Sequence, residues 1–306
     1  MDDVLRMNHV QAVGTHNSYH VDPANGVPPW SYTHRPLDEQ LEEQGVRQFE
    51  LDLYYYGFET PSHFEVFHLP SADDETTCRM FVDCLRRLAD WSDAHPAHHP
   101  IVILLEPKDD FDPALAEAYF ERLEADVASA FPAEKLITPD LVRGDAATLR
   151  EAILGRGWPT LGEVRGRAMF VLLDSGGHRQ FYTHGGANLD GRLFFTQSRE
   201  SDPFAAVLLI DDVLVEGPRI RAAVEQGFLV RTRADVDGEE ARANDRTRAD
   251  AALASGAQMI STDYPAPHPT TGYVVRMPDG TPSRCNPIVA PGGCSPSAVE
   301  DPAFLR

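Results

Sequence analysis

The chain has 306 residues, 42% hydrophobic and 25% charged, which is enough for one large domain or two small ones around a buried core. Its 48 acidic residues outnumber 27 Lys and Arg residues, and the formal net charge of -21 excludes binding to nucleic acid or to anionic membranes through a broadly basic surface. No apolar run approaches the roughly 20 residues that span a bilayer. We therefore expect an acidic globular chain, and nothing in the sequence implies a protein partner.

Short apolar runs rich in β-branched residues alternate with amphipathic stretches along the chain. Strands are predicted, in chain order, at residues 10–14, 46–53, 66–69, 101–106, 168–174, 207–211, 228–231 and 259–262. Helices are predicted between them at residues 36–44, 79–94, 113–130, 146–154, 218–226 and 238–254. This alternation predicts an α/β fold, a parallel (β/α)8 TIM-type barrel. A doubly wound open sheet is the alternative, although no Gly-rich phosphate loop follows the first strand.

The amino-acid composition changes after Pro265, where Pro, Gly and Ser become frequent. We expect residues 1–265 to form the barrel and residues 266–306 to form an irregular extension packed on it. No internal repeat is visible.

The cysteines occur as two local pairs, Cys78 with Cys84 and Cys285 with Cys294. An even, locally paired set favours short-loop disulfides over free thiols, and neither pair has the spacing of a zinc site. Disulfides indicate an oxidising compartment, so we expect a secreted protein. The short acidic start, Met1-Asp2-Asp3, does not resemble a signal peptide, so we expect the mature form.

Polar side chains gather where predicted strands end, which is where a barrel carries its chemistry. The first strand is followed by Gly-Thr-His16-Asn17-Ser, and the second contains Glu50 and Asp52, which share one face of a strand. The third run ends at His68, and the fourth leads into Glu106-Pro-Lys108. These strand ends would bring three carboxylates, one amide oxygen and two histidines to one mouth.

Oxygen ligands of this kind suit a hard cation, Ca²⁺ or Mg²⁺, because close carboxylates repel one another unless a cation lies between them. The two histidines could serve as general acid and general base, since their pKa lies near neutral pH. Other polar runs have a simpler interpretation. We expect the acidic residues at 73–75 and 109–110 to be solvated loop charges, and the histidines at 95, 98 and 99 to lie on the surface.

The residues 11–19, Gln-Ala-Val-Gly-Thr-His-Asn-Ser-Tyr, together with Phe-Glu50-Leu-Asp52, His68 and Leu-Leu-Glu106, resemble the phosphatidylinositol-specific phospholipase C-like phosphodiesterases, in particular their bacterial Ca²⁺-dependent branch. The resemblance covers most of residues 8–110 and, more weakly, residues 229–232 and 260–265. It implies a phosphodiesterase barrel that need not close completely. The metal ligands that it implies are Asn17, Glu50, Asp52 and Glu106. The catalytic histidines that it implies are His16 and His68.

The sequence also departs from this branch. The predicted strand at 168–174 has no lysine where eukaryotic Ca²⁺-dependent members place them, and Glu106-Pro-Lys108 resembles the Glu-x-Lys of glycerophosphodiester phosphodiesterases. The Thr-Asp263-Tyr-Pro ending is also similar to that branch. For the phosphate-binding cation we expect Lys108 or Arg231, and we expect Asp263 to contact the substrate.

The resemblance implies that the inositol 2-hydroxyl of phosphatidylinositol attacks phosphorus, expels diacylglycerol and leaves a cyclic inositol phosphate. We favour Ca²⁺ over Mg²⁺, and which histidine is acid and which is base stays open. Aromatic residues after the first two strands, at positions 30, 32, 54–56 and 58, could form a rim for transient membrane contact, or pack under loops. The alternatives are a glycerophosphodiester phosphodiesterase, a phospholipase D-type toxin, and a non-catalytic module that binds Ca²⁺ and inositol phosphate.

Overall fold

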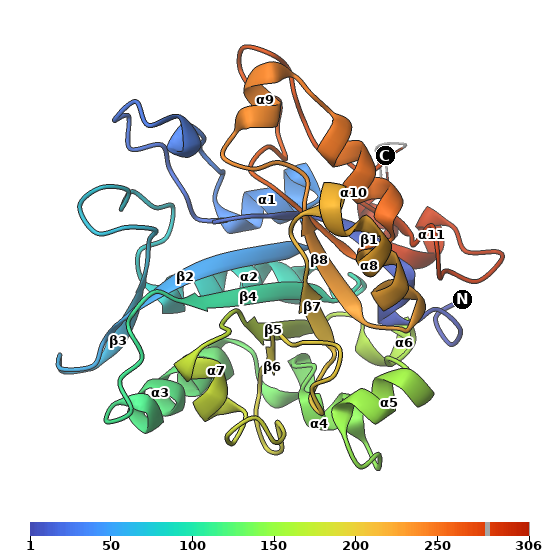
Figure 1. The fold of residues 1–306 in the computed structure, drawn as a ribbon, viewed down its shortest axis with the longest axis horizontal. Coiled ribbons are helices and arrows are strands. Elements are labelled where there is room, and N and C mark those ends of the chain that lie inside the picture. The colour runs from blue at the N-terminus through green and yellow to red at the C-terminus, as the bar shows by residue number, and fades with distance from the viewer. Residues whose placement is uncertain (279–281, 306) are drawn as a thin grey trace.

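Eight parallel strands form the centre of the fold and follow one another around a ring in chain order (Figure 1). The computed structural model describes residues 1–278 and 282–305. The ring strands are β1 (Val10–Thr15), β2 (Gln48–Tyr56), β4 (Ile101–Pro107), β5 (Ala168–Leu172), β6 (Phe195–Thr196), β7 (Val207–Leu209), β8 (Leu229–Arg233) and β9 (Met259–Thr262). β1 pairs with both β2 and β9, and among the described residues β6 and β7 meet through a single bridge, Gln197 with Val207. The predicted (β/α)8 barrel is therefore confirmed, nearly closed with one seam, and the open-sheet alternative is wrong.

The helices lie around the outside of the ring. They are α1 (Leu37–Gln44), α2 (Phe81–Ala94), α3 (Ala116–Ala130), α4 (Pro139–Arg143), α5 (Leu149–Gly155), α6 (Leu161–Val164), α7 (Gly177–Tyr182), α8 (Val213–Glu225), α9 (Glu239–Ala243), α10 (Thr247–Ser255) and α11 (Pro296–Val299). In α2, Phe81, Leu85 and Leu88 recur at helical spacing and are fully buried, so this stripe packs on the strands. α1 is followed by Gly45, whose φ of 71° is a left-handed conformation that glycine adopts without strain.

One predicted ring strand is wrong and one ring strand was missed. Residues 66–69 do not form a barrel strand: β3 (His63–Val66) folds back antiparallel on β2, with Val66 opposite Leu53. The missed strand, β6, has only two residues, which are too few to show the alternation of apolar and polar residues that indicates a strand. The predicted number of eight strands is therefore right although one member is wrong.

The predicted helices differ from the observed ones where a Pro or a left-handed residue intervenes. Pro218 does not start a helix, because α8 begins at Val213, where the Asp212 side chain accepts from the Leu214 amide at 3.2 Å. The predicted helix at 238–254 is divided into α9 and α10 by Asn244, which has a positive φ. α3 begins three residues after Pro113.

The segment after the ring packs on the amino-terminal side of the strands. β10 (Ser283–Cys285) pairs antiparallel with β1, and the Cys78–Cys84 and Cys285–Cys294 disulfides are both formed, as predicted. The division of the chain at residue 265 stays a prediction. No helix in residues 1–278 and 282–305 is long and apolar enough to cross a membrane.

The segment after the ring also explains why the prediction that the histidines at 98 and 99 lie on the surface was wrong. His98 and His99 are buried, not on the surface: His99 Nε2 lies 2.6 Å from the Ser283 hydroxyl and 3.5 Å from the Glu300 carboxylate. Glu300 also pairs with the buried Arg47 guanidinium at 3.3 Å. The burial of His99 therefore involves residues about 200 positions later in the chain, whereas His98 bonds locally to Ser92.

Candidate functional site

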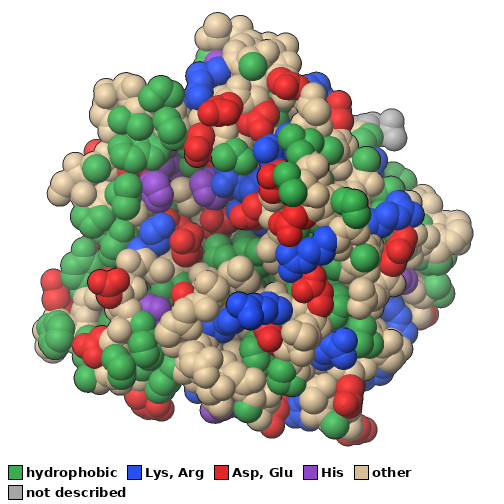
Figure 2. Space-filling view, in the orientation of Figure 1, with side chains coloured by type: hydrophobic (Ala, Val, Ile, Leu, Met, Phe, Trp, Pro, Cys, Tyr) green, Lys and Arg blue, Asp and Glu red, His purple; other side chains and the backbone are tan. Residues whose placement is uncertain are grey.

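The carboxyl ends of β2 and β4 bring three carboxylates together. Asp52 of β2 is in register with Glu106 of β4, and Glu50 lies two residues earlier on the same face. One oxygen of each carboxylate lies within 4.8 Å of the others, and Glu50 and Asp52 are buried. Figure 2 shows acidic, basic and histidine side chains gathered in a hollow of this face.

The electrostatics of this cluster favour a cation. Burial, with added repulsion from Glu106 and Glu50, raises the pKa of Asp52 well above its usual value. Burial and the charge of Glu50 likewise raise the pKa of Glu106. A bound cation would reverse both effects by favouring the ionised carboxylates.

The loop after β1, which carries Asn17, is fastened to β2 next to Glu50. The Ser18 amide donates to the Glu50 carbonyl at 2.9 Å, and the Ser18 hydroxyl accepts from the Glu50 amide at 2.8 Å. Asn17 itself has a φ of 42°, a conformation that Asn tolerates better than most residues.

The buried polar atoms of the site fit a metal ion. Asn17 Oδ1 is buried and has no hydrogen-bond partner among the described residues, while the buried Asp52 carboxylate contacts Lys108 at 3.1 Å and the Tyr19 hydroxyl. A buried oxygen without a donor is costly, and carboxylate and amide oxygens are ligands suited to Ca²⁺.

The two predicted phosphate-binding cations both lie at this cluster, and both are paired with it. Lys108 Nζ is 3.1 Å from Asp52 and 3.4 Å from Glu106. Burial opposes the charge of Lys108, but the two carboxylates raise its pKa above the usual value. Arg231 is buried between Glu50, at 2.5 Å, and Asp211.

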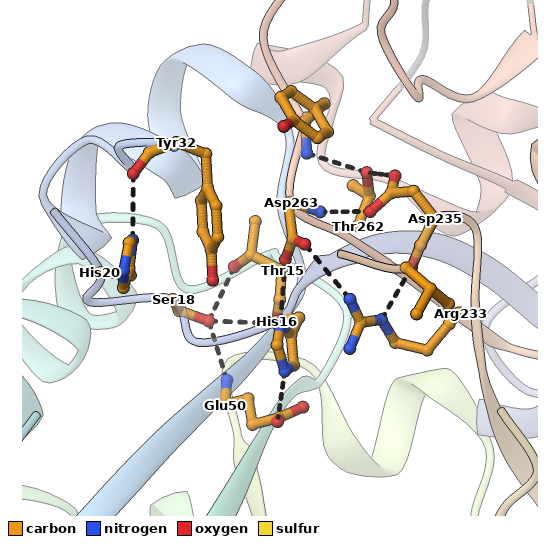
Figure 3. A network of polar contacts seen from close by, with 12 residues as sticks. Thr15, His16, Ser18, His20, Tyr32, Glu50, Arg233, Asp235, Thr262 and Asp263 are labelled. Atoms are coloured by element: carbon orange, nitrogen blue, oxygen red, sulfur yellow. Dashed lines mark hydrogen bonds and ion pairs between the residues drawn. The ribbon is translucent and has the colours of Figure 1, made fainter. Parts of the chain in front are cut away.

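His16 is held by a chain of buried polar groups that crosses from β1 to β9 and β8 (Figure 3). Its Nδ1 lies 2.9 Å from Asp263 Oδ1, and its Nε2 lies 3.7 Å from Glu50. The second oxygen of Asp263 pairs with Arg233 at 3.2 Å. Although burial alone would raise the pKa of Asp263, Arg233 and His16 hold it well below the usual value. Asp263 therefore stays ionised and keeps the His16 proton on Nδ1, so that Nε2 faces the mouth.

The loop after β3 holds His68 through a buried carboxylate. His68 Nδ1 lies 2.7 Å from Asp73 Oδ2, and the Tyr54 hydroxyl donates to the His68 carbonyl at 2.9 Å. Burial lowers the pKa of His68, Asp73 opposes this, and the charges of Lys108 and His16 lower it further. His68 therefore lies within electrostatic reach of the carboxylate cluster, although it is not at the end of a ring strand as predicted.

A second histidine, His20, lies behind Asp73 and is fully buried. Its Nδ1 lies 3.0 Å from the Tyr32 carbonyl and its Nε2 lies 2.8 Å from Asp73 Oδ1. A carbonyl can only accept, so Nδ1 donates to it. Asp73 therefore has one carboxylate oxygen on His20 and the other on His68.

Several interpretations of the sequence are corrected here. Asp73 is not a solvated loop charge: it is fully buried between two histidines. Asp109 is also not solvated, because it is half-buried and accepts from the Tyr55 amide at 2.6 Å. Arg233 was missed, although its spacing of two residues from Arg231 in a strand could have indicated a shared face.

Most of the predicted aromatic rim is packed rather than exposed. Tyr32 is buried and stacks on His20, and Tyr54 stacks on Phe67 with ring centres 4.1 Å apart. Phe58, in contrast, is 89% exposed. In Figure 2, hydrophobic side chains lie to the left of the hollow, over the loop after β1 and the β2–β3 hairpin.

Comparisons with known proteins agree with this geometry. The family model of Ca²⁺-dependent phosphoinositide phospholipase C matches residues 5–59 and 56–287. No curated protein matches the chain significantly. Among solved structures, a calcium-dependent phosphoinositol-specific phospholipase C from Pseudomonas sp. in complex with myo-inositol has a TM-score of 0.65 at 19% identity, covering 93% of this chain and 96% of its own.

Two further structures have the same fold. A Ca²⁺-dependent phosphatidylinositol-specific phospholipase C from Streptomyces antibioticus has a TM-score of 0.62 at 19% identity, covering 86% of this chain and 96% of its own. The phosphatidylinositol-specific phospholipase C of Listeria monocytogenes has a TM-score of 0.56 at 13% identity, covering 87% and 92%. Because the family model spans most of the chain, this protein belongs to the Ca²⁺-dependent phosphoinositide phospholipase C family and is a phosphodiesterase.

Proposed function

We propose that this enzyme cleaves phosphatidylinositol to diacylglycerol and a cyclic inositol phosphate in a Ca²⁺-dependent reaction. The observation that supports this best is the combination at one mouth of a buried oxygen cluster with two histidines, each oriented by a buried aspartate. A pure binding site has no need of two oriented histidines.

Asn17, Glu50, Asp52 and Glu106 would hold the Ca²⁺ ion, for which an all-oxygen donor set is suited. Bound Ca²⁺ would lower the pKa of the attacking 2-hydroxyl and offset the charge that builds on the phosphate. Lys108 and Arg231 already pair with this cluster, which supports a role for them in binding phosphate oxygens that approach it.

His16 and His68 would move the two protons of the reaction. One accepts the proton of the inositol 2-hydroxyl as its oxygen bonds to phosphorus. The other donates a proton to the diacylglycerol oxygen as its bond to phosphorus breaks. Asp263 and Asp73 keep each Nδ1 protonated, which leaves the two Nε2 atoms for these transfers. Both oxygens of Asp263 are engaged by protein groups, so we assign it this orienting role instead of substrate contact.

Transient contact with a membrane would occur through the apolar side of the mouth. Phe58, in the turn between β2 and β3, and Leu69 are exposed, and Trp30 packs edge-on to His68. Insertion of such side chains into the lipid interface offsets the repulsion expected for a chain of charge -21. The two disulfides support a secreted location.

Phosphorus NMR of the products from phosphatidylinositol tests the proposal. With Ca²⁺ we expect a cyclic inositol phosphate signal that disappears with chelator. His16→Ala and His68→Ala should each reduce the rate by about 10²–10⁴-fold, as is usual for a general acid or base. His184→Ala, at an exposed histidine away from the mouth, is the matched control.

The same experiment separates the alternatives. Cleavage of glycerophosphoinositol or glycerophosphocholine without turnover of the lipid would assign the enzyme to a soluble substrate and overturn the proposal. Binding of Ca²⁺ without turnover of either substrate would indicate a binding module. Near-full activity in both histidine variants would overturn the assigned chemistry.

A further inference from the structure

Three arginines line one cavity at the end of the barrel opposite the mouth. Arg167 directly precedes β5, Arg6 lies before β1, and Arg156 follows α5, so all three lie toward the amino ends of the strands. The cavity has a volume of about 580 Å³, within the range of small-molecule sites. Figure 1 shows its neighbours α4, α5 and α6 beside one another at the lower right.

None of these three arginines has an acidic partner among the described residues. Acidic residues outnumber basic ones by 48 to 27, and most arginines in the described residues form ion pairs with them. Within residues 1–278 and 282–305, no carboxylate lies within ion-pair distance of the side chains of Arg6, Arg156 or Arg167. Arg6 and Arg156 instead donate to backbone carbonyls, those of Trp158 and Val142, and Arg167 donates to none in these residues.

The one carboxylate that lines the cavity in the described part of the chain is already occupied. Glu163 accepts from the amide and the hydroxyl of Thr160, at 2.8 and 2.9 Å, and thereby caps α6. These hydrogen bonds are the main reason that its pKa is lowered, and Arg6 and Arg156 add to the effect from a distance. The cavity therefore keeps a net positive charge, and two of the three arginine side chains that carry it are held by backbone carbonyls.

We propose that this cavity is a binding site for a small phosphorylated anion, separate from the catalytic mouth. Guanidinium groups bind phosphate oxygens through paired N–H donors. A guanidinium group that is already hydrogen-bonded to a backbone carbonyl is partly ordered before the ligand binds. Arg167, which has no hydrogen-bond or ion-pair partner among the described residues, supplies the free fork, and Arg6 and Arg156 flank it. The apolar walls from Leu141, Trp158 and Pro159 leave room for a ligand larger than one phosphate group.

Calorimetric titration of the metal-free protein with pyrophosphate tests the site, because without Ca²⁺ the acidic mouth repels anions. We expect one pyrophosphate per chain with a Kd below about 1 mM, bound more tightly than inorganic phosphate and more weakly as salt rises. Arg167→Gln should weaken binding about tenfold or more, the usual consequence of losing a hydrogen bond from a charged group. If that variant does not fold, Arg156→Gln, at an exposed position, provides the same test.

Two control variants locate the site. Arg199→Gln removes an equal charge from an exposed arginine outside the cavity, and it should bind pyrophosphate like the parent protein. Lys108→Gln removes a cation of the mouth and should also leave binding unchanged. No saturable binding up to about 10 mM, equal affinity in Arg167→Gln and the parent, or loss of binding in Lys108→Gln would each overturn the proposal. Because the assay measures no turnover, its failure would leave the proposed catalytic function untouched.

Discussion

Replacement of Asp73 by asparagine tests the link between the buried carboxylate and His68. The amide oxygen of the introduced side chain can accept from His68 Nδ1, and its NH₂ group can donate to His20 Nε2 once His20 is neutral. All three side chains therefore keep their hydrogen bonds, and the change removes the charge while the fold is kept. The substitution removes the charge from the 2.7 Å hydrogen bond between Asp73 and His68. Because Asp73 is fully buried, solvent does not screen that charge in the parent protein.

A hydrogen bond to a charged group contributes about 1.5–3 kcal/mol, so kcat should fall by about 10- to 150-fold while KM changes little. Asp73 raises the pKa of His68 against the larger effect of burial. Without the carboxylate this pKa falls, and the limb of the pH–rate profile that belongs to His68 moves to lower pH, whether His68 is acid or base.

The assay is the initial rate of phosphatidylinositol cleavage over a range of pH at saturating Ca²⁺. Asp74→Asn is the matched control, because Asp74 is its neighbour, is partly exposed and lies 3.9 Å from Arg79. An unchanged kcat together with an unmoved limb in Asp73→Asn would refute the reasoning, as would an equal loss in the control.

Two further predictions concern the membrane and the stability of the barrel. Phe58→Ser should weaken binding to phosphatidylinositol vesicles severalfold in a sedimentation assay, with no change in the rate on a water-soluble inositol phosphodiester; equal losses on both substrates would contradict an interfacial role. Glu300→Gln leaves Arg47 buried without its partner, so thermal unfolding should show a loss of about 3–5 kcal/mol, the usual cost of breaking a buried ion pair. Burial would raise the pKa of Glu300, but Arg47 and His99 hold it well below the usual value. The stabilising effect of Glu300 is therefore full above its usual pKa of about 4.3 and is lost as the pH falls below it, a decline that should be smaller in the variant.

The ligand cluster could be predicted from sequence because it depends on local rules. The alternation of side chains along a strand places Glu50 and Asp52 on one face, and the parallel register brings Glu106 beside them. Residues 101–105 form an unbroken apolar run, and all five are buried. These features need no knowledge of distant residues.

The groups behind the histidines could not be predicted, because their roles arise from long-range contacts. Asp73 lies in an acidic loop that has the composition of a solvated turn, and its burial follows from His20, 53 positions earlier. Arg233 depends on Asp263, 30 positions later. The division of residues 238–254 at Asn244 reflects a single left-handed residue, which helical periodicity does not reveal.

The most direct test of the central claim is a Ca²⁺ titration that follows metal binding by calorimetry and phosphatidylinositol cleavage by product formation, in the parent protein and in Asp52→Asn. The parent should bind one Ca²⁺ in the mouth, with activity rising over the same concentrations and absent in chelator. Asp52→Asn should lose both binding and activity, because it removes a buried carboxylate from the centre of the acidic cluster. Full activity in chelator, or Ca²⁺ binding that survives unchanged in Asp52→Asn, would contradict the assignment of the acidic cluster as the metal site.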